Sequence, residues 1–115
     1  MNNKILDDMR KMIEGVDPEG DHFDTDLKIH INSVFHRLKT LGVGPTPVFQ
    51  IETGDETWDD FFGDNPMPMV KSYMEMDVKM MFDPPTSSIA AESFKRQIDK
   101  YEWLLRCDAE ENQNG

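Results

Sequence analysis

The side chains that could bind a metal ion are three histidines and one cysteine, and their spacing does not favour a shared site. They are His22, His30, His36 and Cys107. His30 and His36 are six residues apart, which places them on different faces of a helix, and the sequence contains no CxxC or HxxxH motif. We therefore expect structural roles for these residues and no metal site.

An acidic run near the N-terminus is similar to a calcium-binding loop in composition alone. It consists of Asp17, Glu19, Asp21, Asp24 and Asp26. A calcium loop needs a glycine at its sixth position and a glutamate at its twelfth, where this chain has Lys28. We interpret these carboxylates as solvated turn and helix-capping residues.

Catalytic chemistry has equally little support in the sequence. Asp59 and Asp60 form a carboxylate pair, but adjacent side chains diverge on a helix, and no histidine or serine nucleophile is placed to join them. The sequence also lacks a glycine-rich phosphate-binding loop. It therefore predicts a protein that is not an enzyme and uses no cofactor.

Composition excludes several classes of binding protein. The 115 residues include 12 Lys and Arg against 23 Asp and Glu, so the net charge is −11, whereas a protein that reads nucleic acid needs a basic face. No apolar run approaches the roughly 20 residues of a membrane-spanning helix. The N-terminus lacks the apolar stretch of a signal peptide, and a single cysteine fits a reducing compartment, so we expect a cytoplasmic chain.

The elements that must position any functional residue are predicted to be mainly helical. Apolar periodicity and capping residues indicate a small four-helix domain, with helices near 5–16, 24–41, 66–82 and 87–106. Asp24 and Asn65 are the expected N-caps of the second and third helices, and Pro66 is expected at the first position of the third. We divide the chain into a single domain over residues 1–106 and a flexible acidic tail over residues 107–115.

Each helix has a predicted buried stripe. In the second it consists of Leu27, Ile31, Val34, Phe35, Leu38 and Leu41, and in the fourth of Phe94, Ile98, Tyr101 and Leu105, with Trp103 off the stripe. Apolar residues cover most of the third helix, which should be central and most buried. Asp77 falls on its apolar side, so we expect either a partner such as Lys28, Arg37 or a backbone donor, or a half-exposed position.

Residues 43–65 form a long, partly extended loop between the second and third helices. Val48–Ile51 is prone to β structure and could be a hairpin strand, a strand shared between neighbouring copies, or plain extended backbone. Thr57 to Gly63 is predicted to form a capped single helical turn that carries Trp58, Phe61 and Phe62. Loops of this length are commonly functional or ordered by a partner.

Several segments, in order, resemble the head–tail connector (head-completion or adaptor) proteins of long-tailed bacteriophages. They are Phe23–Asp26, Ile31–Phe35, Leu41–Pro45, Thr57–Phe61, Gly63–Asn65, Phe82–Ser88 and Glu102–Leu104, and together they cover most of residues 5–106. None of these segments is a chemical signature, so the resemblance concerns fold and role rather than a catalytic site.

The resemblance implies a non-enzymatic virion assembly protein at the head–tail junction. Such proteins form an oligomeric ring, usually twelvefold, that binds the portal of the DNA-filled head, extends its channel and presents a platform to the stopper or tail. The implied partners are therefore the chain itself, the portal and a tail-side protein, with DNA as cargo only and no membrane. The implied location is the virion, and the host cytoplasm during assembly.

Charge and aromatic content suggest where copies of the chain would meet. Residues 27–50 carry a net charge of +3 and residues 51–66 a net charge of −6, and a ring needs an interface of two unlike patches. The two segments meet either within one molecule or between neighbouring copies. The predicted interface residues are Lys28, Arg37, Lys39, Phe49, Asp55, Glu56, Trp58, Asp59, Asp60, Phe61 and Phe62.

Two alternatives compete with this interpretation. An acidic protein could mimic DNA and inhibit a nucleic-acid enzyme, although these acids cluster on either side of a basic segment instead of lining one face. A small enzyme would need a nucleophile, metal or phosphate motif. For the loop aromatics, the alternative to an interface is a satellite core beneath the loop.

Overall fold

The described part of the chain folds into five helices, with little regular secondary structure between them. A computed structural model describes residues 4–11, 24–45, 47–63 and 66–114. The helices are α1 (Ile5–Lys11), α2 (Asp24–Thr40), α3 (Trp58–Phe62), α4 (Pro68–Phe82) and α5 (Ser88–Asn114). The mainly α class is confirmed, because four of these helices correspond to the predicted ones and α3 is the predicted capped turn.

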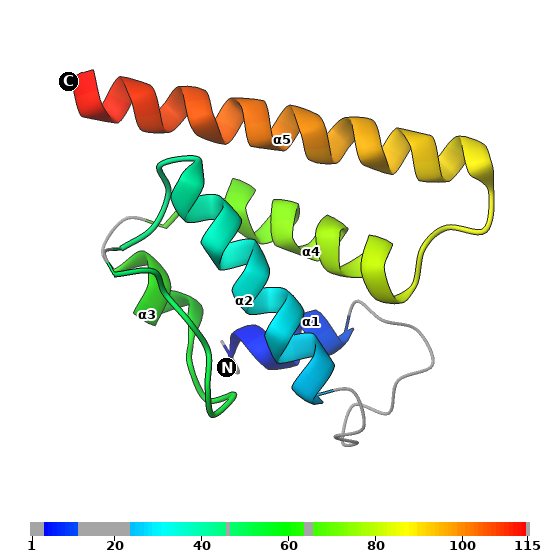
Figure 1. Cartoon of the computed structure of the whole chain (residues 1–115), viewed down its shortest axis with the longest axis horizontal. Helices are drawn as coiled ribbons and strands as arrows, with labels where there is room; N and C mark the ends of the chain where they lie inside the picture. The colour runs from blue at the N-terminus through cyan, green and yellow to red at the C-terminus, as the bar shows by residue number, and fades with distance from the viewer. Residues whose placement is uncertain (1–3, 12–23, 46, 64–65, 115) are drawn as a thin grey trace.

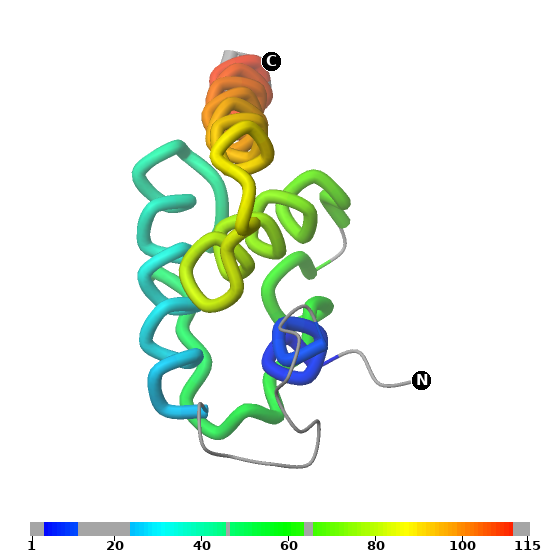
Figure 2. Tube along the Cα trace, turned by 90° about the vertical axis from the view of Figure 1, so that its right-hand side faces the viewer, coloured from blue at the N-terminus to red at the C-terminus, as the bar shows by residue number. Residues whose placement is uncertain are grey.

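The helices pack around one hydrophobic core (Figure 1). Helices α4 and α5 form an antiparallel hairpin, α2 packs across α4, and α1 packs against α2. Figure 2 looks nearly along α5 and shows that this helix lies at one edge, with α4 between it and the rest of the chain. The predicted central position of α4 is therefore confirmed.

Helix α2 follows its sequence pattern closely. Every residue of its predicted stripe, from Leu27 to Leu41, is buried. The helix ends where the amide of Gly42 donates to the Lys39 carbonyl and the amide of Val43 donates to the Leu38 carbonyl, at 3.0 and 2.8 Å. Gly42 has a φ of 94°, which is the left-handed glycine conformation that terminates helices in this way. The predicted N-cap Asp24 is instead the first residue of α2, and its carboxylate accepts a hydrogen bond from Arg10 Nε of α1 at 2.8 Å.

Helix α4 begins later than predicted. Pro68, and not Pro66, occupies its first position, and the N-cap is Met67, which supplies no side-chain hydrogen bond. The predicted N-cap Asn65 lies outside the described residues. A proline is tolerated at the first position of a helix because the amide there needs no partner, so Pro66 and Pro68 are both acceptable starts. Met67 packs against the core as the N-cap, which agrees with a start at Pro68.

The methionine-rich surface of α4 is only partly buried. Val70, Tyr73, Met74 and Val78 are buried, whereas Met81 is 60 % exposed. The prediction that apolar residues would be buried around most of the helix is therefore wrong at its C-terminal end. There α4 leads to the Pro84–Pro85 connection, and the neighbouring helices no longer enclose it.

Helix α1 agrees with its prediction over the described residues, and helix α5 is longer than predicted. Ile5, Leu6 and Met9 of α1 are buried as expected, and the predicted continuation to Val16 lies outside the described residues. Helix α5 begins at Ser88, where the Ser87 hydroxyl accepts a hydrogen bond from the Ala90 amide at 3.3 Å. It continues without a break through the predicted tail to Asn114, and Ala109 is buried. The division of the chain at residue 106 stays a prediction.

The loop before α3 is extended but forms no strand within the described residues. Val48–Ile51 therefore does not form the hairpin strand within one chain, and the alternative of a strand shared between neighbouring copies stays a prediction. Asn32 of α2 holds the loop, because its amide Nδ2 donates to the Ile51 carbonyl at 2.9 Å and its Oδ1 accepts from the Ile51 amide at 2.8 Å. The Asn32 side chain thus makes the two backbone hydrogen bonds of Ile51 that a neighbouring strand would otherwise make.

Candidate partner-binding surfaces

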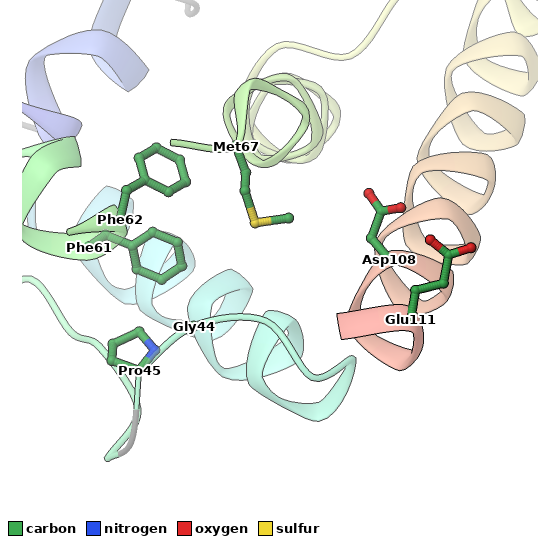
Figure 3. A pocket seen from close by; sticks show the side chains of 7 residues that line it. All are labelled: Gly44, Pro45, Phe61, Phe62, Met67, Asp108 and Glu111. Carbon is green, nitrogen blue, oxygen red and sulfur yellow. The ribbon is translucent and has the colours of Figure 1, made fainter. Parts of the chain in front are cut away.

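An open groove of about 710 Å³ lies where the ends of four elements converge (Figure 3). Its lining residues are Gly44 and Pro45 after α2, Phe61 and Phe62 of α3, Met67 before α4, and Asp108 and Glu111 of α5. Figure 3 shows the aromatic rings and the Met67 thioether on one side and the two carboxylates on the other. We call this the α3–α5 groove. Its floor is apolar and one rim is acidic.

The short helix α3 is fixed by reciprocal capping. The Thr57 hydroxyl accepts from the Asp60 amide at 3.2 Å, and the Asp60 carboxylate accepts from the Thr57 amide at 2.9 Å. At the other end the Gly63 amide donates to the Asp59 carbonyl at 2.8 Å. This is a complete capping box, as the sequence predicted, and it holds five residues in a helix that would be too short to persist without such support.

Capping directs the α3 aromatics to different places. Phe61 is 7 % exposed and packs on Phe35 at a ring-centroid distance of 4.7 Å. Phe62 is partly buried and stacks on Trp58 at 5.9 Å, with its ring along the groove. Gly44 allows the loop to approach, because a Cβ at this position would lie 3.1 Å from Phe61, and its φ of 111° disfavours other residues.

Trp58 belongs to the core rather than to a surface. It is 2 % exposed, and its indole Nε1 donates to Asp8 of α1 at 2.7 Å. The Lys71 ammonium lies 5.3 Å from the centre of the ring and 3.6 Å from the same carboxylate. For Trp58 and Phe61 the structure therefore agrees with the satellite-core alternative, while Phe49 and Phe62 are partly buried against the core.

The predicted interface acids divide into two groups. Asp60 caps α3, and Glu56 accepts hydrogen bonds from the amides of Glu52, Thr53 and Gly54 at 2.7, 3.2 and 2.9 Å. Partial burial opposes ionisation of Glu56, but these backbone hydrogen bonds outweigh it and lower its pKa to about 2. Asp55 and Asp59 are exposed, and Asp55 pairs with Lys4 at 3.0 Å.

The predicted basic residues lie on α2, and one of them belongs to a polar network. Arg37 Nη1 donates to Asp77 of α4 at 2.8 Å and to the Tyr73 hydroxyl at 3.3 Å, and this hydroxyl donates to Glu102 of α5 at 2.8 Å. The predicted pairing of Asp77 with Arg37 is confirmed. Burial raises the pKa of Tyr73 well above its usual range, so Tyr73 stays protonated and serves as the donor.

The other two basic residues, Lys28 and Lys39, are half-buried on α2. The Lys28 side chain lies near the acidic loop, because its Cε would be 3.9 Å from a Cβ placed on Gly54. Segments 27–50 and 51–66 therefore lie side by side within one molecule, as the Asn32 contact also requires. Some charged side chains of these segments, such as Arg37 and Asp55, already have partners within the chain.

A second, smaller groove of about 370 Å³ lies at the opposite ends of α2 and α4. Asp26, Ile29, His30, Ser33, Met81 and Phe82 line it. Ile29 and Met81 are 64 % and 60 % exposed, and His30 packs edge-on against Phe82 at 5.7 Å. His30 Nε2 is 3.9 Å from Asp77, which agrees with the structural role expected of this histidine.

The outer face of α5 carries an exposed aromatic residue that was not among the predicted interface residues. Trp103 is 61 % exposed, and Lys100 and Arg106, one turn before and after it, are exposed as well. Its position off the buried stripe was the available signal. The two grooves had no signal in the sequence, because each joins ends of elements that are distant along the chain.

In the described part of the chain, no group of three or more His, Cys, Asp or Glu side chains could hold a metal ion. Among residues 4–11, 24–45, 47–63 and 66–114, no helix is long and apolar enough to cross a bilayer.

Comparison with known proteins identifies a family. A family model described as "Phage connector protein" matches residues 5–112, which is nearly the whole chain. No curated protein and no solved structure matches. The matched range includes all five helices apart from the last two residues of α5, and both grooves.

Proposed function

The chain belongs to the phage connector protein family and is a virion assembly protein, and from this premise we propose that it forms an oligomeric ring at the head–tail junction. In this proposal the ring binds the portal of the DNA-filled head on one side and the stopper or tail on the other. It extends the channel through which DNA passes, and it has no catalytic role. The family match over residues 5–112 is the observation that carries the proposal.

The distribution of surfaces supports a ring. A ring needs two different patches on each copy, so that one patch meets the other on the next copy. The α3–α5 groove lies at the C-terminal end of α2 and the N-terminal end of α4, whereas the smaller groove lies at their other ends. The molecule therefore has chemically unlike surfaces at separate places.

The net charge supports DNA as cargo rather than as a bound ligand. Multiplied around a ring, a charge of −11 per copy repels phosphate, so DNA slides past without adhering. The same charge is the main support for the DNA-mimic alternative. We do not favour that alternative because the family match covers residues 5–112 and the acids flank a basic segment instead of lining one face.

We retain a charge contact between copies as part of the proposal, in a narrower form. Arg37, Glu56 and Asp60 already have partners within the chain. Asp55 is likewise paired with Lys4, so the contact is proposed between Lys28 of one copy and Asp59 of the next. Asp59 is exposed on α3, beside the aromatic residues of the α3–α5 groove.

A stop codon in this gene of the phage tests the proposed function. The expected result is that heads and tails are both made but remain separate, and that the intact chain supplied in trans restores joined particles. Electron microscopy counts the joined and separate particles. Joined, infectious particles made without the chain would contradict the proposal.

A further inference from the structure

Trp103 has no role in the fold, and this makes its surroundings informative. It lies on the side of α5 that faces away from α4 and is 61 % exposed, whereas Leu105 on the inner side is fully buried. Lys100 and Arg106 lie three residues away in either direction, so they flank the indole on the same face. The outer face of α5 therefore presents a large aromatic ring with a cation on either side, and with the exposed carboxylate of Asp99 one turn before it.

The α3–α5 groove has the complementary chemistry. Its floor consists of Phe61, Phe62 and Met67, and its rim carries the carboxylates of Asp108 and Glu111 (Figure 3). Its volume of about 710 Å³ lies within the roughly 300–1,000 Å³ of pockets that enclose ligands larger than one side chain. The aromatic rings and the Met67 thioether offer apolar contacts to an indole, and the two carboxylates offer partners to cations beside it.

We propose that Trp103 of one copy inserts into the α3–α5 groove of the next copy, with Lys100 and Arg106 paired to Asp108 and Glu111. This inference rests on the proposed ring and specifies its contact. Tryptophan and arginine are the residue types that most often dominate the binding energy of interfaces, above all where they enter an apolar pocket. The charge pairs at the rim add specificity and orientation.

The two patches are unlike and lie on different sides of the same helix, as a head-to-tail contact between copies requires. Trp103 and Asp108 are five residues apart on the same helix, so they are about 7.5 Å apart along its axis and point about 140° away from each other. The protruding patch and the receiving patch therefore lie at nearly one height on different sides.

Other exposed apolar residues fit this contact less well. Ile89 is 81 % exposed at the start of α5 but is far along the helix from the groove. Ile29 and Met81 line the smaller groove, which has the carboxylate of Asp26 and lacks a pair of flanking cations among its lining residues. Ile89 therefore provides a matched control position on the same helix.

Photo-crosslinking in assembled phage tests the contact directly. A photoreactive phenylalanine analogue replaces Trp103 in the full chain, with a second variant carrying the analogue at Ile89 as control. The expected product joins residue 103 to a peptide containing residues 61–67 or 106–112 of another copy, identified by mass spectrometry. A crosslink from residue 103 to the portal, to a tail-side protein, or to another region of the chain would overturn the proposal.

Complementary variants test the same contact by rescue. K100E/R106E removes the cationic patch and D108K/E111K removes the acidic rim, and each is expected to lower particle joining by at least tenfold. The combined quadruple variant exchanges the charges and should recover most of the joining. A quadruple variant no better than either double variant, with unchanged helix content by circular dichroism, would contradict the pairing.

The outcomes separate this inference from the proposed function. If the chain is present at the head–tail junction but residue 103 crosslinks elsewhere, the ring stands and the Trp103 contact is wrong. If the chain is absent from purified particles, the proposed function itself fails.

Discussion

The α3 segment and the outer face of α5 contain similar residue types, and they use them in opposite ways. The α3 segment, residues 51–63, buries Trp58 to 2 % exposure and uses the exposed carboxylate of Asp60 to cap its helix. The outer face of α5 leaves Trp103 61 % exposed between two exposed cations. Aromatic and charged content therefore does not identify an interface until burial and backbone hydrogen bonding are known.

The two tryptophans provide the sharpest test of this contrast. Trp58→Ala should lower the free energy of unfolding by about 3–5 kcal/mol, because it leaves a cavity and removes the partner of Asp8. Trp103→Ala should change stability by less than about 0.5 kcal/mol, because the side chain is on the surface. Urea unfolding followed by circular dichroism measures both. Equal losses would show that the two regions do not differ as described.

Asn32→Ala tests how firmly the α3 segment is held to α2. Both backbone groups of Ile51 lose their partner and are partly buried, so we expect a loss of about 2 kcal/mol in unfolding free energy. Asn32→Asp is the matched control, since it keeps the acceptor for the Ile51 amide and loses the donor to the carbonyl. Its loss in the same urea experiment should be distinct from zero and no larger than that of the alanine variant.

The neighbouring acids Asp59 and Asp60 separate folding from assembly. Asp60→Ala removes half of the capping box and should cost about 1 kcal/mol of stability. Asp59→Ala should leave stability within about 0.5 kcal/mol, because this exposed carboxylate is not part of the box. Asp59→Lys should weaken assembly if the proposed charge contact forms. Normal joining of heads and tails by that variant would remove the contact from the account.

Glu56 should produce the smallest effect, and its sign is set by pH. Its pKa in the folded chain is lowered to about 2 from 4.5, so its stabilisation is present above pH 4.5 and is lost as the pH falls toward 2. Because the carboxylate is near solvent, we expect about 1 kcal/mol or less. Urea midpoints between pH 6 and pH 2.5 should fall more for the native chain than for Glu56→Gln. Parallel curves would contradict the role of the backbone hydrogen bonds.

Sequence reasoning predicted the elements better than the surfaces. The stripe of α2, its Gly42 terminus and the Thr57 capping box are local features, and each was predicted correctly. The start of α4 was wrong because Pro66 and Pro68 satisfy the same local rule and packing chooses between them. The Asn32–Ile51 contact and the α3–α5 groove join residues 19 and more positions apart, so no local pattern announces them.

The central claim is that this family member forms the ring between head and tail, and electron cryomicroscopy of the head–tail junction in intact particles tests it most directly. The account predicts a ring of copies of this five-helix fold between the portal and the tail-side protein, with the outer face of each α5 against the α3–α5 groove of its neighbour. A junction in which portal and tail-side protein touch with no ring of this fold between them would contradict it.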